Sequence, residues 1–183
     1  MTKLLRNINE KMQSCLLKLY LRGNQLQNIP KEIGRLVNLI ILNLENNQLQ
    51  SIPVEIGELK KMKILCFKNN QLQSIPKEIG KLKKLDDLDF QNNQLQNIPK
   101  EMGELKKLYN LDLGNNQLQV LPTEIGNLLN LRTLHLNNNQ LQSLPKEIGK
   151  LEKLRYLDVR SNQIPENEIE NIKKMLPNCN VII

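Results

Sequence analysis

The chain has 183 residues, of which 39% are hydrophobic, 25% are charged and only 3% are aromatic, and its formal net charge is +7. This length suits one domain with a real core, and the composition is that of a folded protein, so a disordered chain and a pair of full-sized domains are both excluded. No apolar run approaches the roughly 20 residues of a membrane-spanning helix, so no transmembrane segment is expected.

The N-terminal residues predict a cap and not a leader peptide. Apolar residues recur at helical spacing within residues 2–12, namely Leu4, Leu5, Ile8 and Met12. We expect a short helix there, within an N-terminal cap at residues 1–15. The same stretch has no continuous apolar block before a small-residue cleavage site, so no signal peptide is visible.

From residue 16 onward the chain repeats itself every 23 residues. The repeat units share the pattern L-x-x-L-x-L-x-x-N-Q-L-Q-x-I/L-P-x-E-I-G-x-L-x-x, and their positions are numbered 1 to 23 below. Seven units cover residues 16–164, the last with an altered second half, and they begin at Leu16, Leu39, Met62, Leu85, Leu108, Leu131 and Leu154. Since no unit can bury its apolar edge alone, neighbouring units must stack into a solenoid.

The constant positions of the unit have distinct structural roles. Positions 4 and 6 alternate with polar residues, as Leu42 and Leu44 do, and predict a strand with one face inward. Position 9 is Asn in all seven units, and a buried Asn can hydrogen-bond to the backbone where the strand ends. Positions 14 to 19 predict a short helical turn, in which Pro76 fixes φ, Glu78 suits the helix N-terminus and Gly80 permits a tight exit.

The C-terminal residues 165–183 predict a second cap. Pro165 opens an amphipathic helix with acidic residues in its first turn and lysines in its last turn, and Pro177 stops it. The apolar residues of this helix are Ile169, Ile172, Met175 and Leu176. Leu176, Cys179 and Val181 then reproduce the spacing of positions 1, 4 and 6, so we expect an eighth strand at residues 178–182.

The repeat pattern resembles the leucine-rich-repeat family, in the 23-residue bacterial form that is abundant in pathogenic spirochaetes. The resemblance implies an α/β fold, a curved solenoid with a parallel sheet of about eight strands on its concave face, short helical turns on its convex face and helical caps. It also implies recognition of another protein by the concave face, a role in host interaction or virulence, and export or display at the cell surface. Family membership alone identifies neither the partner nor an oligomeric state.

The three cysteines are Cys15, Cys66 and Cys179. They fall in coils that are at least two strand spacings of about 4.8 Å apart, beyond the roughly 7 Å between Cα atoms that a disulfide allows, so we expect no disulfide. No C-x-x-C or His-x-x-Cys spacing predicts zinc. Cys66 should face the concave surface, where a passive small side chain is favoured over a reactive thiol.

The charge pattern argues against nucleic acid. Positions 16, 20, 22 and 23, on the expected convex side, carry 14 Lys and Arg, but nine Glu share that half of the solenoid and no aromatic residue is interleaved for base stacking. We therefore expect a solvated basic back and no nucleic-acid partner. The alternative function is a surface adhesin that binds matrix polyanions through this basic convex side, with Lys83, Lys84, Lys106 and Lys107 among its contacts.

Enzyme motifs are missing from the sequence. There is no G-x-x-x-x-G-K-S/T loop, no G-x-G-x-x-G after a strand and no G-x-S-x-G elbow. His135 is the only histidine, and Asp112 and Asp158 are its expected neighbours, but no Ser or Cys nucleophile shares its surroundings on this face. We predict a non-enzymatic chain in which His135 is a surface residue.

The variable positions 2, 3, 5 and 7 should stand on the concave face and form a partner-binding surface. They give an apolar cluster in the first units, an acidic middle, and aromatic and basic residues in the last units, and Tyr and Arg are favoured in protein interfaces. The predicted partner-binding residues are Tyr20, Ile41, Ile64, Cys66, Asp87, Asp89, Tyr109, Asp112, Arg132, His135, Arg155, Tyr156 and Asp158.

The acidic middle is also a weak candidate for a calcium site. Asp87 and Asp89 point the same way, and Asp112 is expected one strand from Asp89, at about 4.8 Å. A divalent cation, or a Lys or Arg of a partner, would relieve the repulsion between the carboxylates. A flat sheet face offers too few oxygen ligands for calcium, so metal binding is the weaker interpretation and no cofactor is expected.

Overall fold

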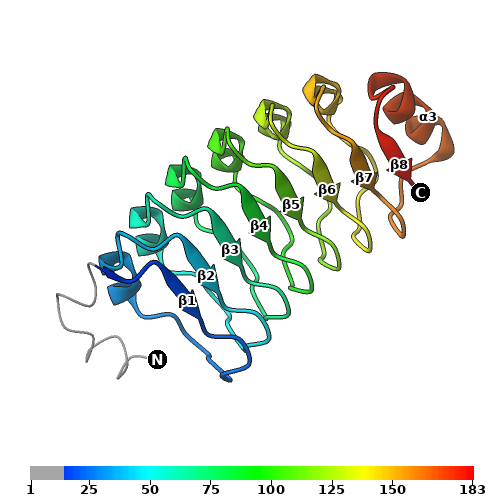
Figure 1. The fold of residues 1–183 in the computed structure, drawn as a ribbon. Helices are drawn as coiled ribbons and strands as arrows, with labels where there is room; N and C mark the ends of the chain where they lie inside the picture. Colours follow the sequence, from blue (N-terminus) through cyan, green and yellow to red (C-terminus); the bar gives the residue numbers. More distant parts are fainter. Residues whose placement is uncertain (1–14) are drawn as a thin grey trace.

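The computed structural model describes residues 15–183, which form one stack of coils held by a continuous parallel sheet. Each coil contributes one strand, and the strands follow in sequence order from one end of the stack to the other (Figure 1). The strands are β1 Lys18–Tyr20, β2 Ile41–Asn43, β3 Ile64–Cys66, β4 Asp87–Asp89, β5 Asn110–Asp112, β6 Thr133–His135, β7 Tyr156–Asp158 and β8 Asn180–Ile182. The predicted curved solenoid is confirmed, whereas the predicted helix at residues 2–12 lies outside the described residues.

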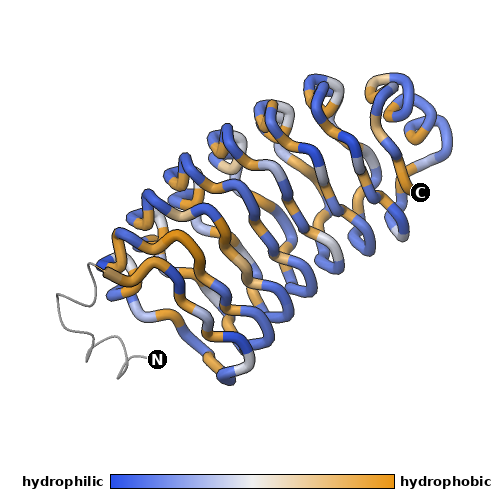
Figure 2. The backbone as a smooth tube through the Cα atoms, in the orientation of Figure 1, coloured by the Kyte–Doolittle hydropathy of each residue, from blue (hydrophilic) through white to orange (hydrophobic). Residues whose placement is uncertain are grey.

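Neighbouring strands pair without an offset between units. Leu42 lies beside Leu65 and Leu65 beside Leu88, so position 4 of each unit meets position 4 of the next. These leucines are fully buried, and Figure 2 shows hydrophobic residues recurring at the same place in each coil. Phe67 and Phe90, both at position 6, stack inside the core with ring centroids 5.3 Å apart. The core is therefore a set of rows that run along the solenoid axis.

In each of the first six coils, a short 3-10 helix on the side opposite the strand returns the chain toward the next strand. Each of these helices follows a proline in extended conformation and has a glutamate in its first turn, as the sequence predicts. They are η1 Lys31–Arg35, η2 Val54–Glu58, η3 Lys77–Lys81, η4 Lys100–Glu104, η5 Thr123–Asn127 and η6 Lys146–Lys150.

The glycine of these turns has a different role from the tight exit that we expected. Its φ is not in the left-handed region, so the backbone alone does not demand glycine there. A Cβ placed at Gly57 would lie only 2.8 Å from the backbone oxygen of Glu78 in the next coil. Glycine at position 19 therefore allows the convex sides of neighbouring coils to approach closely.

The asparagines of position 9 hold each coil to the one before it. Five of them are buried, each with 8% of its surface exposed: Asn47, Asn70, Asn93, Asn116 and Asn139. Asn93 Nδ2 donates to the backbone oxygens of Phe67 and Phe90, both at 3.0 Å. Its Oδ1 accepts from the backbone N–H of Leu72 at 3.0 Å. The predicted hydrogen bonding is confirmed, and it joins two coils as well as closing one turn.

Position 8 has a constraint that the sequence analysis missed. Its residue is left-handed in every unit, with φ between 53° and 69°, and it is Asn in five units, from Asn46 to Asn138. Gly23 and Ser161 occupy it in the first and last units. Asn is one of the few side chains that adopt this conformation readily, so the run of asparagines at position 8 is explained by the turn.

The C-terminal cap contains α3 Glu166–Met175, which follows Pro165 as predicted and is followed by β8. The predicted eighth strand is confirmed, but its predicted register is wrong. Val181 pairs with Leu157, so Val181 and not Cys179 takes position 4. The helix returns the chain by a different path from a 3-10 turn, which shifts the strand relative to the leucine spacing.

Removal of the Asn93 side chain should destabilise the fold. Asn93→Ala leaves the Leu72 N–H without its acceptor and removes the shared donor of two carbonyl oxygens. We expect a loss of about 1–3 kcal/mol, measured as the shift of the urea unfolding midpoint followed by circular dichroism. The control is Gln91→Ala in the same turn, for which we expect a change within about 0.5 kcal/mol. Equal shifts for the two variants would contradict the role assigned to position 9.

Candidate functional site

The concave face is built from two rows of side chains that alternate with the buried leucines. Position 3 of neighbouring strands aligns in one row, in which Ile41, Ile64 and Asp87 are consecutive. Position 5 aligns in the second row, in which Asp112 lies beside His135 and His135 beside Asp158. The expected neighbours of His135 are thereby confirmed. The row order follows directly from the 23-residue spacing, because the strands pair without an offset.

The second to fifth units contain a depression with an aliphatic floor, called the apolar hollow below. It has a volume of about 410 Å3 and lies at the N-terminal ends of β2 to β5. Its lining residues are Ile40, Ile41, Lys63, Ile64, Asp86, Asp87, Lys107, Tyr109 and Asn110. Ile64 and Tyr109 are 40% and 44% exposed, which is high for large apolar side chains on a sheet. Four predicted partner-binding residues are thus brought together: Ile41, Ile64, Asp87 and Tyr109.

Ile40 belongs to the apolar hollow but is missing from the predicted surface. It occupies position 2, the same position as Tyr109 and Arg132, so repeat alignment alone could have identified it. Tyr20 is 62% exposed, but it lies on β1 and does not line the hollow. Of the apolar cluster expected from Tyr20, Ile41, Ile64 and Cys66, Ile41 and Ile64 line the hollow, which extends further along the chain to Tyr109.

The carboxylates of position 5 accept hydrogen bonds from backbone N–H groups at the ends of their strands. Asp89 Oδ1 accepts from the backbone N–H of Gln91 at 2.8 Å, and Asp112 Oδ1 accepts from that of Gly114 at 2.9 Å. Burial raises the pKa of both carboxyl groups above the usual range, and the charge of Asp112 adds to the increase at Asp89. Asp at this position therefore has a structural role, which the sequence analysis did not recognise.

No metal centre is evident in the part of the chain that the structure describes. Within residues 15–183, no three His, Cys, Asp or Glu side chains are grouped so that they could hold a metal ion. The weak candidate Asp87, Asp89 and Asp112 gains no support, because one oxygen each of Asp89 and Asp112 is engaged by the backbone. Asp87 accepts from Asn110 Nδ2 at 3.3 Å.

Cys66 is half-buried beside Asp89. Its Sγ donates to Asp89 Oδ2 at 3.7 Å. Burial raises the pKa of the Cys66 thiol to about 12, and the carboxylates of Asp89 and Glu45 contribute to the increase. Since the thiolate is the reactive form, this favours the passive side chain over the reactive thiol.

The outward side chains of the last units contact one another and the backbone more than the sequence suggests. The rings of His135 and Tyr156 lie 5.2 Å apart. Asp158 is only 2% exposed and accepts from Arg160 Nη2 at 2.6 Å and Nε at 3.0 Å. Arg155 Nη1 donates to the backbone oxygen of Glu152 at 3.0 Å. Of the predicted residues here, Asp158 is buried in the described structure, and Arg155 is held by its own turn.

A second depression, called the basic hollow below, adjoins the apolar hollow. It has a volume of about 280 Å3 and is lined by Asp86, Lys107, Tyr109, Asn130, Arg132 and Lys153. The Arg132 guanidinium lies over the Tyr109 ring, 5.2 Å from its centroid. Two predicted residues, Tyr109 and Arg132, are therefore in contact, and Lys107 and Lys153 of position 23 line the same hollow.

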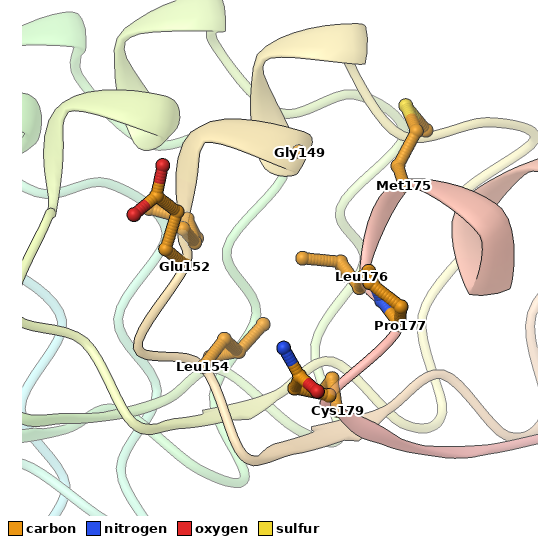
Figure 3. Close-up of a pocket in the computed structure, with 9 residues that line it drawn as sticks. Gly149, Glu152, Leu154, Met175, Leu176, Pro177 and Cys179 are labelled. Carbon is orange, nitrogen blue, oxygen red and sulfur yellow. The ribbon is translucent and has the colours of Figure 1, made fainter.

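The C-terminal cap leaves a third depression of about 400 Å3, which contains no predicted site residue (Figure 3). Its lining includes Leu154, Met175, Leu176 and Cys179. It arises because α3 replaces a 3-10 turn: a Cβ at Gly149 would meet Met175 Cβ at 3.3 Å, where the earlier glycines meet backbone. We attribute it to this change of packing.

Cys66 should be alkylated very slowly in the folded protein. At pH 8 a thiol with a pKa of about 12 is ionised far less than a free cysteine with a pKa of about 8.5, so we expect iodoacetamide to react at least about a hundredfold more slowly than in the denatured chain. Mass spectrometry of timed samples measures this. Asp89→Asn should increase the rate, because it removes a negative charge beside the thiol. Equal rates in the folded and denatured protein would contradict the assignment.

Asp158 should make the stability depend on acid pH. Its burial disfavours the carboxylate, but the hydrogen bonds and charge of Arg160 outweigh this and hold the pKa of Asp158 below its usual value. A lowered pKa stabilises the fold above the unfolded value of about 3.9, and this contribution is lost as the pH falls toward the folded value. Asp158→Asn should therefore lower the Tm at pH 7, and the difference from the native protein should begin to narrow below about pH 4 and disappear as the pH falls past the folded pKa. A difference that stays constant with pH would rule out the charged pair as its cause.

Comparisons with known proteins agree with this architecture. A family model described as a leucine-rich repeat region matches residues 7–113 and 107–177. A leucine-rich-repeat protein of Leptospira interrogans is 43% identical with a TM-score of 0.91, over 95% of this chain and 44% of that chain. The ectodomain of the receptor kinase GASSHO1/SCHENGEN3 from Arabidopsis thaliana, in complex with CASPARIAN STRIP INTEGRITY FACTOR 2, is 34% identical with a TM-score of 0.80. The match covers 94% of this chain and 22% of that chain. An internalin of Listeria monocytogenes is 25% identical with a TM-score of 0.79, and the match covers 94% of this chain and 48% of that chain.

The chain spans less than half the length of each of these three proteins. No curated protein matches it. Within residues 15–183, no helix has the length and apolar character to cross a bilayer. The Leptospira match confirms the resemblance to bacterial proteins of the 23-residue type. Since the family model covers most of the chain and the solved structures share its fold, this chain is a member of the leucine-rich-repeat family, whose domains are typically non-enzymatic modules that bind other proteins.

Proposed function

We propose that this chain is a non-enzymatic protein-binding module that recognises its partner through the concave face. The observation that carries the proposal is the apolar hollow, where Ile64 and Tyr109 are exposed on the sheet surface. Burial of such side chains against a partner stabilises a complex by about 25 cal/mol per Å2 of apolar surface. Aromatic and arginine side chains at its margin, Tyr109 and Arg132, are of the types that dominate binding energy in interfaces.

The alternative, a polyanion-binding adhesin, receives less support from the contacts of the convex side. Lys83 forms an ion pair with Glu104, and Lys81 Nζ lies 3.9 Å from Glu58 Oε1. Lys106 Nζ donates to the backbone oxygen of Asn127 at 3.2 Å. These lysines are partly neutralised or engaged within the protein, so their charge is less available to a polyanion. A role at a host surface rests on the family resemblance and belongs to the proposal.

Charged substitutions in the apolar hollow should abolish partner binding without unfolding the chain. Asp87 occupies position 3 in β4, so the fold accommodates Asp at this position, and Ile41→Asp with Ile64→Asp should retain the native circular dichroism spectrum. A pull-down from host-cell extract, quantified by mass spectrometry, should retain proteins on the native chain that are lost from this double variant. Both substitutions place a charge on the floor where an apolar partner group would lie.

The matched control is Val54→Asp. Val54 is 53% exposed at the start of η2, on the opposite side of the coil, and should leave the captured proteins unchanged. A captured set that is the same for the native chain and the double variant would refute the concave face as the binding surface. Loss of the same proteins from Val54→Asp would point to the convex side instead.

A further inference from the structure

The apolar hollow and the basic hollow are one continuous surface. They share Asp86, Lys107 and Tyr109, and the Tyr109 side chain forms a wall of both. We infer that the partner segment seated here is an extended stretch of protein chain that places an apolar side chain in the apolar hollow and an aspartate or glutamate in the basic hollow. The inference rests on the proposed function and adds the chemistry of the partner.

The charge of the basic hollow calls for an anionic group. Lys107, Arg132 and Lys153 line it, against the single carboxylate of Asp86. Among residues 15–183, the ion pairs within 4.0 Å are Arg22–Glu45, Lys81–Glu58, Lys83–Glu104 and Arg160–Asp158, so none of these three cations has an acidic partner. An uncompensated group of cations favours a carboxylate, which can accept hydrogen bonds from Arg and Lys together.

Two of the three cations, Arg132 and Lys153, are also held in place before any partner arrives. Arg132 lies over the Tyr109 ring at 5.2 Å, which restricts the guanidinium. Lys153 Nζ donates to Asn130 Oδ1 at 2.7 Å. Because these side chains are already ordered, binding of a carboxylate costs less conformational entropy than it would with free side chains.

A basic partner residue is the less favourable occupant. The nearby carboxylates that would attract it are already used within the protein: Asp89 and Asp112 accept from backbone N–H groups, and Asp87 accepts from Asn110. Asp86 is the remaining acid at the margin, and it faces three cations. The balance of available charge therefore favours an acidic segment.

The spacing between the apolar residue and the acidic residue of the partner segment follows from the geometry of the sheet. Ile64 is in β3 and Arg132 directly precedes β6, three strands further along the stack. Three strand spacings of about 4.8 Å amount to roughly 14 Å, which an extended chain covers in about four residues at 3.3 Å each. The acidic residue should therefore lie about three to five residues from the apolar one.

The first test is selection from a displayed library of random 12-residue peptides on the native protein alone, and the binding of the enriched peptides to Ile41→Asp/Ile64→Asp is measured afterwards. We expect enriched sequences to carry Asp or Glu three to five residues from Leu, Ile, Val or Phe. Enrichment of basic residues at that spacing, enrichment without a charge preference, or no enrichment at all would overturn the inference.

The second test measures the affinity of the most enriched peptide, and of its Asp→Asn or Glu→Gln version, by fluorescence anisotropy. Arg132→Gln with Lys153→Gln should weaken the acidic peptide by about tenfold or more and leave the amide version nearly unchanged. Asp86→Asn should strengthen the acidic peptide, whereas it would weaken a basic one. The matched control, Lys31→Gln with Lys77→Gln, removes the same net charge on the 3-10 turns η1 and η3, on the opposite side of the coils from the hollows. Equal weakening of the acidic peptide by the two double variants would show that overall charge alone causes the effect, and would overturn the basic hollow as the binding site.

The two proposals fail in different ways. If the peptide loses binding to Ile41→Asp/Ile64→Asp but tolerates Arg132→Gln/Lys153→Gln, the concave face stands as the binding surface and the acidic subsite is wrong. If the peptide binds Ile41→Asp/Ile64→Asp as well as the native protein, the concave hollow is refuted and the acidic subsite falls with it.

Discussion

The hydrogen bonds of the buried asparagines determine the geometry of the whole solenoid. Each buried Asn side chain bonds to the backbone of its own coil and of the coil before it, as Asn93 does with Phe90 and Phe67. A polar side chain in the core is costly unless its donors and acceptor are satisfied, and one coil alone cannot satisfy them. The spacing and alignment of the strands are therefore imposed at every junction, and the aliphatic rows fill the space that this framework leaves.

A rigid framework allows the outward positions of the strands to vary without affecting the core. Positions 2 and 3 vary among the units while position 4 is always leucine. Because neighbouring strands are aligned, a side chain in one unit is placed beside its counterpart from the next, and residues 23 apart in the chain become one surface. The apolar hollow is such a surface, drawn from four strands, and Tyr109 connects it to Arg132 and Lys153 of the following coil.

The 23-residue period was sufficient to predict the fold, because periodic leucine and asparagine specify both the strand and its pairing. The exceptions are local. The register of β8 was wrong because α3 replaces the repeating return path, so the leucine spacing no longer applies. The position 5 acids were assigned to binding because their hydrogen bonds to Gln91 and Gly114 involve only backbone, which sequence does not reveal. The hollow itself depends on side-chain sizes in four coils, and the sequence predicted only Ile41, Ile64, Asp87 and Tyr109 among its lining residues.

The identical packing at each junction has an evolutionary consequence. The glycine of position 19 meets the same backbone oxygen of the next coil from Gly34 to Gly126, and the left-handed turn at position 8 recurs in every unit. Each internal coil thus presents the same two faces to its neighbours, so a gene segment encoding one unit can be duplicated or deleted in frame with every contact rebuilt. Recombination would then lengthen or shorten the concave surface one strand at a time, and bring new combinations of outward side chains together without a new fold.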